Sequence, residues 1–137
     1  MDYIEFKVQH SELIMYCQII ENDLKWIYSF MHKGKPNQTR NQVSDLSLGQ
    51  IVKELKYLDG SDGVFWISEE TYDFLLHMSK ARNYWCHQCY IDFVYNKEGW
   101  DSKEYEDVCK KLKKQHDRFK EIFEQVEQRK LIIAQTR

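Results

Sequence analysis

Apolar side chains recur along the first part of the chain with the period of an α-helix. Between about Phe6 and His32 they follow one another mostly at helical spacing, which places them in two adjacent stripes on a single helix. A helix that is apolar around so much of its circumference is expected to pack against several neighbours. The first stripe consists of Leu13, Ile20, Leu24, Ile27 and Met31, and the second consists of Val8, Met15, Ile19, Trp26 and Phe30.

Helix breakers and capping residues mark the next boundaries. The segment 34–37, Gly-Lys-Pro-Asn, ends the first helix, because proline cannot continue it and glycine or asparagine easily adopts left-handed geometry. The polar stretch that follows predicts a loop as far as Asp45. Ser47 and Gln50 have the spacing of a capping box, which predicts a short second helix ending near Leu58.

A third helix is predicted after a cluster of turn-forming residues at 59–63. The apolar segment 64–67 has no partner strand elsewhere in the sequence, so it is interpreted as an apolar lead-in to this helix. Ser68 is a suitable N-cap, and Glu69 in the first turn suits the helix dipole. The helix is then expected to run to about Tyr95.

The last predicted helix is long. The segment 96–99 breaks the preceding pattern, and Asp101 and Glu104 repeat the capping-box spacing, so this helix should extend to about Ile133. Together the four segments predict an all-α, four-helix bundle formed by one domain over residues 1–137. The expected inner face of the last helix consists of Val108, Leu112, Phe119, Ile122, Val126 and Ile133.

Composition narrows the class of protein. The chain has 137 residues, 42% of them hydrophobic and 31% charged, which is typical of a globular domain with a real core. A net charge of −2 predicts no general attraction to nucleic acid or membrane. The N-terminus lacks an apolar signal core and no apolar run approaches membrane-spanning length, so we expect a cytoplasmic protein with no membrane partner. The four cysteines form no dense framework and are expected to be reduced.

Arg82 occupies a position where a core residue is expected. Leu75, Met78, Trp85 and Cys89 lie on the same stripe of the third helix, and a guanidinium cannot lose its proton when it is buried. Burying such a cation without a partner is costly, so Arg82 should meet an anion or a partner subunit, or the stripe should face a cleft.

The segment that follows carries a family resemblance. Arg82 is followed by Asn83 and, five residues after the arginine, by His87, late in the third helix of a small bundle. This Arg-x4-His arrangement resembles the signature of the HEPN domain. Asp23-Leu24-Lys25 in the first helix also resembles the family's acidic, apolar, then basic or polar pattern. The resemblance covers nearly the whole chain in the order of its helices.

The resemblance implies a metal-independent endoribonuclease of the toxin or phage-defence type, with no cofactor. Such domains typically pair as homodimers, which bring two Arg/His sets together at a cleft, and an antitoxin or inhibitor protein is a possible further partner. RNA carries its own nucleophile, the 2′-hydroxyl, so the protein needs only a proton carrier and phosphate stabilisation. His87 and Arg82 suit these two tasks.

Asn83 joins Arg82 and His87 in the expected catalytic set, and supporting roles are considered for Asp23, Tyr84, Trp85 and Tyr90. Asn83 lies four residues before His87, hence on the same helical face, where it could orient the imidazole or bind substrate. Asp23 is expected to hold Arg82 or a bound group, and Tyr84, like Trp85, is a candidate for stacking on a base. In members controlled by a nucleotidyltransferase antitoxin, the motif resembles Arg-x4-His-x-Tyr with a modified tyrosine. Here Tyr90 lies one position later than that pattern requires.

Three other interpretations of these residues remain open. Arg82 could form a salt bridge with Asp23 or Glu21 that serves only the structure. The segment 86–89, Cys-His-Gln-Cys, could be half of a zinc site, although structural zinc needs four ligands and no second Cys-x2-Cys is present. The basic run 110–120 could follow an RNA backbone or form the solvated face of the last helix, and the second is the more frequent case.

The alternative to an enzyme is a noncatalytic HEPN-like helical module that uses the same cleft for a nucleotide or a protein partner. In this sequence, the one feature that favours an enzyme over such a module is the presence of Arg82, Asn83 and His87 together. A scaffold would not require all three.

Overall fold

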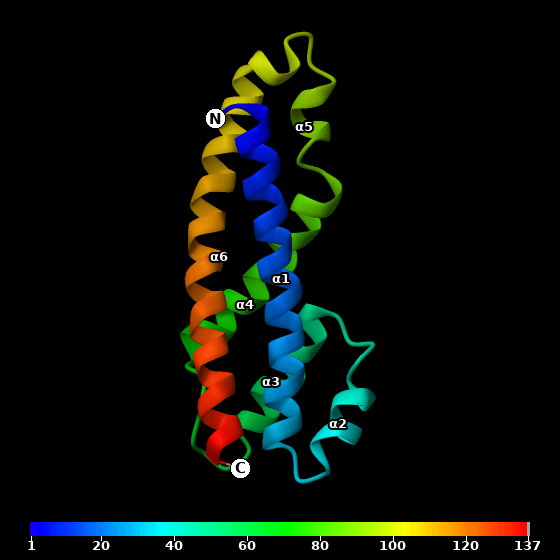
Figure 1. Cartoon of the computed structure of the whole chain (residues 1–137), viewed down its shortest axis with the longest axis vertical. Helices are drawn as coiled ribbons and strands as arrows, with labels where there is room; N and C mark the ends of the chain where they lie inside the picture. The colour runs from blue at the N-terminus through cyan, green and yellow to red at the C-terminus, as the bar shows by residue number, and fades with distance from the viewer. Residues whose placement is uncertain (137) are drawn as a thin grey trace.

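The computed structural model describes residues 1–136, and every regular element in this range is helical (Figure 1). The prediction of an all-α helical bundle is therefore confirmed for these residues, with six α-helices instead of the expected four. The elements are α1 (Tyr3–Met31), α2 (Pro36–Gln42), α3 (Leu48–Asp59), α4 (Glu69–His87), α5 (Ile91–Val94), the 3-10 helix η1 (Gly99–Asp101) and α6 (Lys103–Thr136).

The two long helices, α1 and α6, run parallel to each other along the whole molecule (Figure 1). Side chains fix their register at three levels. The Tyr105 hydroxyl donates to the Met1 carbonyl over 2.7 Å, His116 Nε2 lies 3.1 Å from Glu12 Oε2, and Lys130 Nζ donates to Asp23 Oδ1 over 2.8 Å. These contacts join residues 104 to 107 positions apart, which is the constant offset of a parallel pair.

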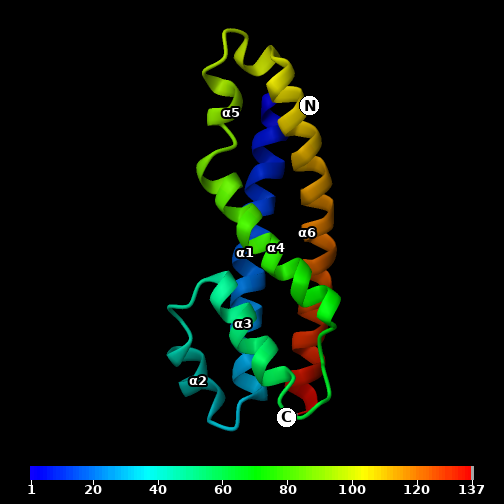
Figure 2. The ribbon, with the colours of Figure 1, turned by 180° about the vertical axis from the view of Figure 1, so that it is seen from behind.

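The other helices cover this pair. Figure 2 shows α4 crossing in front of α1 and α6, with α3 beside the C-terminal half of α1 and α5 beside its N-terminal half. The first stripe of α1 faces the core as predicted, apart from Met31, which is half-buried. All six residues of the expected inner face of α6 are buried. The second stripe of α1 is less covered than predicted, since Val8 and Met15 are exposed.

The polar stretch after the first break is partly helical, contrary to the predicted loop. Pro36 occupies the first turn of α2, where its fixed φ favours a helix start and its missing N–H is not needed. The guanidinium of Arg40 then lies above the Trp26 ring of α1, 5.8 Å from its centroid. This contact covers part of the second α1 stripe.

The capping box of α3 is confirmed. Ser47 Oγ accepts from the Gln50 N–H over 3.3 Å, and the Gln50 side chain accepts from the Ser47 N–H over 2.9 Å. The apolar segment 64–67 forms no strand, as expected, and Ser68 caps α4 by accepting from the Thr71 N–H.

The predicted end of the third helix was wrong. Instead of continuing to Tyr95, α4 ends at His87, where the N–H groups of Gln88 and Cys89 both donate to the Tyr84 carbonyl. The chain then turns and forms the short α5. After this turn, Tyr90 and Phe93 pack against Phe6 of α1, as described below. A continuous helix would lose these contacts.

The cap of α6 also differs from the prediction. Ser102, which is 2% exposed, accepts from the Tyr105 N–H over 3.1 Å, whereas Asp101 lies one residue earlier and is exposed. The hydroxyl of Ser102 also donates to the Gly99 carbonyl over 2.6 Å. Ser102, and not Asp101, therefore caps α6, because it accepts from an N–H group that has no partner within the helix.

We expect Ser102→Ala to lower the free energy of unfolding by about 1 kcal/mol, the usual effect of losing a side-chain N-cap. Asp101→Ala is the matched control and should change it by less than about 0.5 kcal/mol. Urea denaturation followed by circular dichroism measures both. Equal effects of the two substitutions would contradict the assignment of the cap.

No helix within residues 1–136 is both long and apolar enough to cross a membrane.

Candidate functional site

Arg82 faces the interior side of α4 and pairs with α1. Its Nη1 lies 3.3 Å from Glu21 Oε1, and the two side chains are 29% and 24% exposed. Glu21 also accepts from Lys25 over 3.4 Å, and Lys25 donates in addition to the Ser44 carbonyl over 2.9 Å. The cation on the apolar stripe is thus compensated by a carboxylate, while about a third of its side chain still reaches the surface.

Asp23 does not hold Arg82, contrary to one of the expectations from the sequence. Its carboxylate accepts from Lys130 on α6, and its second oxygen is buried with no hydrogen-bond partner. The reason is rotational. Residues two apart on a helix differ by about 200° in direction, so Glu21 faces α4 while Asp23 faces α6.

His87 and Asn83 lie on the outer side of α4. Both residues are exposed, and no hydrogen bond or ion pair of either side chain is found within residues 1–136. The four-residue spacing keeps the two on one face, as predicted. Five residues of helix, however, turn the chain through about 500°, so Arg82 and His87 point roughly 140° apart. The guanidinium and the imidazole therefore do not lie on the same face of α4.

Tyr84 connects the end of α4 to α5 and α6. Its hydroxyl donates to Asp92 Oδ2 over 2.7 Å, and Lys111 Nζ lies 3.7 Å from the centroid of its ring. Burial and the hydrogen bond to Asp92 raise the pKa of the Tyr84 phenol. The pKa of Asp92 is lowered by hydrogen bonds from Gln88 and Tyr84 and by the charge of Lys111. Tyr84 is therefore neutral at physiological pH, and one face of its ring carries a cation.

Trp85 is a core residue and cannot stack on a base. It is 1% exposed, and its indole N–H donates to Gln115 Oε1 on α6 over 2.5 Å. Its carbonyl lies 2.7 Å from His10 Nε2 on α1. Trp85 thus fixes the end of α4 against both long helices and holds the neighbouring motif residues in place.

Tyr90 lies in an aromatic cluster at the N-terminal end of α1. Its ring centroid is 5.5 Å from that of Phe6 and 5.2 Å from that of His10. Phe6 also contacts Phe93 and Trp100 edge to face. Burial raises the pKa of the half-buried Tyr90 phenol. Tyr90 has a structural environment and contacts neither Arg82 nor His87.

Cys17 and Cys89, the two buried cysteines near the motif, are not thiolates. Burial raises the pKa of Cys17 to about 12 and that of Cys89 to about 11, and the Cys89 thiol donates to the Trp85 carbonyl. Cys86 is exposed, so the two cysteines of the 86–89 segment lie in different environments. Among residues 1–136, no three His, Cys, Asp or Glu side chains are grouped so that they could hold a metal ion.

Lys111 is the residue near the motif that the sequence did not single out. It was one of several lysines in a basic run, and nothing local distinguishes it from the others. Its position above Tyr84 depends on how α4 crosses α6, which residue spacing does not encode. Of the residues proposed from the sequence, Arg82, Asn83, Tyr84 and His87 share the C-terminal part of α4, while Asp23 and Tyr90 lie apart from them.

No known protein family matches this chain, and no curated protein or solved structure matches it either.

Proposed function

We propose that this protein is a metal-independent endoribonuclease of the HEPN type that acts as a homodimer. Arg82 binds the phosphate and His87 moves the proton, with Asn83 positioning the imidazole or the substrate. The observation that carries the proposal is the end of α4, where an arginine oriented by a carboxylate is followed by an exposed histidine that has no hydrogen bond or ion pair with residues 1–136. An imidazole that is exposed and not held by such interactions is available to a substrate.

The chemistry needs only these groups. The 2′-hydroxyl of RNA attacks the adjacent phosphorus while its proton passes to a base, and the bond to the 5′-oxygen of the next nucleotide breaks as that oxygen takes up a proton. The products are a 2′,3′-cyclic phosphate and a free 5′-hydroxyl. Histidine titrates near neutrality and can act as the base or the acid. The permanently charged guanidinium of Arg82 stabilises the charge that develops on the phosphate.

The divergence of Arg82 and His87 around α4 is the reason for proposing a composite site. Within a protomer the two side chains point roughly 140° apart, so they cannot easily meet one phosphate. If two copies of α4 pack across a two-fold axis, Arg82 of one protomer can share a cleft with His87 of the other. The homodimer is therefore part of the mechanism in this proposal.

A basic surface on α6 supports RNA as the substrate. Residues 110–120 contain six Lys or Arg residues and a single acid, Asp117. Lys111 lies over Tyr84, and Arg118 lies over the Phe74 ring of α4, 4.7 Å from its centroid. The basic surface therefore begins beside the helix that carries His87, where it can attract the phosphates of a bound strand.

The second candidate is a noncatalytic helical module that binds a nucleotide or a protein, such as an antitoxin or inhibitor. The ion pair between Arg82 and Glu21 favours it, since that pair satisfies the arginine without any substrate. The exposed His87 is what separates the two functions, because a structural ion pair gives no role to a histidine on the opposite side of the helix.

The purified protein should cut a looped RNA in the presence of EDTA, and the fragments should carry 2′,3′-cyclic phosphate ends in mass spectrometry. The same RNA with 2′-O-methyl groups should remain intact, because it lacks the nucleophile. Cleavage that requires magnesium, or that persists on the methylated RNA, would refute the mechanism. If no RNA is cut, the binding module is the better description.

A further inference from the structure

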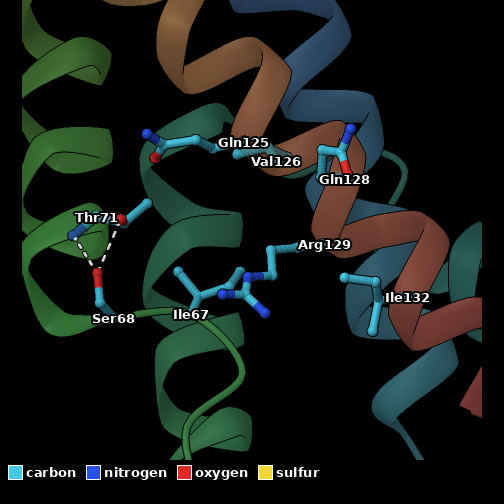
Figure 3. Close-up of a pocket in the computed structure, with 8 residues that line it drawn as sticks. All are labelled: Ile67, Ser68, Thr71, Gln125, Val126, Gln128, Arg129 and Ile132. Atoms are coloured by element: carbon cyan, nitrogen blue, oxygen red, sulfur yellow. Dashed lines mark hydrogen bonds between the residues drawn. The ribbon is translucent and has the colours of Figure 1, made fainter.

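A cavity of about 420 Å³ lies between the start of α4 and the C-terminal part of α6. Its apolar wall is formed by Ile67 and Val126, which are 3% and 1% exposed, and by Ile132, which is 39% exposed. Gln125 and Thr71 contribute polar atoms at the rim (Figure 3). A volume of this size and a largely apolar wall with a few polar groups are typical of sites for small molecules.

Among residues 1–136, Arg129 is the single charged residue that lines this cavity. Figure 3 shows its side chain extending from α6 across the cavity toward Ile67. None of the eight lining residues is acidic. The helical neighbours of Arg129 at three and four positions are Gln125, Val126, Ile132 and Ile133, so α6 offers it no carboxylate either.

Two other cations of the C-terminal half of α6 are engaged. Lys130 pairs with Asp23 over 2.8 Å, and Arg118 pairs with Glu121 over 2.8 Å. For Arg129, no ion pair or hydrogen bond of the side chain is found within residues 1–136. Ser68 and Thr71 satisfy each other, since the Ser68 hydroxyl donates to Thr71 Oγ1 over 2.9 Å. Within residues 1–136, the exposed Arg129 guanidinium thus lies beside the apolar wall of this cavity without a counter-charge.

We propose that this cavity binds a small organic acid. Its carboxylate lies against the guanidinium of Arg129, and its apolar body packs on Ile67, Val126 and Ile132. Charge complementarity selects the anion, and the apolar wall selects a ligand with a hydrocarbon or aromatic part over a simple inorganic ion. The cavity lies at the first turn of α4, roughly 28 Å along the helix from His87, so the proposal is independent of RNA cleavage.

Hydrocinnamate is a suitable probe, because it combines a carboxylate with a phenyl ring on a short chain. Its neutral isostere, hydrocinnamyl alcohol, has the same apolar body without the charge. Titration of the labelled full chain by NMR should give chemical-shift changes confined to residues 67–71 and 125–132 for both compounds. Hydrocinnamate should bind more tightly than the alcohol, since it gains charge-assisted hydrogen bonds to Arg129.

Two substitutions separate the contributions of charge and apolar surface. Arg129→Gln should weaken hydrocinnamate binding roughly 10- to 100-fold and leave the alcohol unchanged, because only the carboxylate contacts the guanidinium. Ile132→Ser should weaken both compounds. Lys120→Gln, an exposed cation on the same helix, is the matched control and should affect neither.

Three outcomes would overturn the proposal. They are no binding of hydrocinnamate at millimolar concentration, shift changes centred elsewhere on the chain, and an Arg129→Gln protein that binds hydrocinnamate as the wild type does. Circular dichroism of each variant shows that a loss of binding is not a loss of the fold.

Discussion

Replacing His87 by alanine is expected to lower the rate of RNA cleavage by about 10²–10⁴-fold, the usual effect of losing a positioned acid or base. The fold should survive. His87 is exposed at the end of α4, and its side chain has no hydrogen bond or ion pair within the described part of the chain. The free energy of unfolding should therefore change by less than about 0.5 kcal/mol, which denaturation of the same preparation measures.

Arg82 provides a graded comparison for the same reaction. Arg82→Ala should reduce cleavage as strongly as His87→Ala, and Arg82→Lys should recover only part of it, because lysine cannot offer the two-pronged contact to phosphate oxygens. When the ion pair between Arg82 and Glu21 is lost, Lys25 still neutralises the Glu21 carboxylate, so the fold should survive the substitution. A folded His87→Ala protein that cleaves like the wild type would refute the proposed mechanism.

Mixing the two inactive variants tests the composite site. In a dimer of one Arg82→Ala and one His87→Ala protomer, one of the two clefts contains both an arginine and a histidine. An exchanging mixture should therefore recover up to about a quarter of the wild-type activity. If each protomer holds its own complete site, the mixture stays inactive. That result, with light scattering showing a monomer, would reject the dimer cleft while leaving the roles of the two residues in place.

Local signals in the sequence predicted the starts of α3 and α4 correctly but not the end of α4. The capping box at Ser47 and the N-cap at Ser68 depend on contacts within three residues, so both were correct. The end of α4 depends on Tyr90 and Phe93 packing against Phe6, more than eighty residues earlier in the chain. No spacing near residue 87 carries that information, which explains why the third helix was predicted to be too long.

In the candidate site, too, local helical geometry was predictable and contacts between distant helices were not. The sequence placed Arg82 on the apolar stripe of α4. It indicated Glu21 and Asp23 as possible partners but gave no reason to choose between them. The choice follows from the angle at which α4 crosses α1, together with the parallel register that directs Asp23 toward Lys130. The shared face of Asn83 and His87 needed only helical geometry, so it was predictable. Their catalytic role remains a prediction.

The largest expected effect on stability comes from Asp59, which the sequence marked only as part of a turn. The residue is 1% exposed at the end of α3 and accepts three hydrogen bonds. Oδ1 accepts from the Trp66 N–H over 2.9 Å, and Oδ2 accepts from the Ile67 N–H over 3.2 Å and from the Tyr72 hydroxyl over 2.6 Å. A single carboxylate thus joins α3, the lead-in segment and α4.

Asp59→Ala should lower the free energy of unfolding by about 3 kcal/mol or more, because it leaves three donors in a buried region without an acceptor. Tyr72→Phe should cost about 1 kcal/mol, since it removes one donor and leaves the carboxylate with two. Asp62→Ala is the matched control. Asp62 is exposed, and within residues 1–136 it accepts only from the Val64 N–H over 3.0 Å, so this substitution should change the free energy of unfolding by less than about 0.5 kcal/mol.

Hydrogen exchange tests whether the loss of stability comes from the connection between α3 and α4. If Asp59 acts by tying the lead-in to α4, Asp59→Ala should speed hydrogen exchange at the Trp66 and Ile67 amides far more than Tyr72→Phe does. Urea denaturation gives the free energies, and exchange monitored by NMR gives the local effect. An Asp59→Ala protein as stable as the Asp62→Ala control would show that these three hydrogen bonds do not hold the α3–α4 connection. In that case the apolar contacts of Ile67 and Tyr72, both buried, would suffice to hold it.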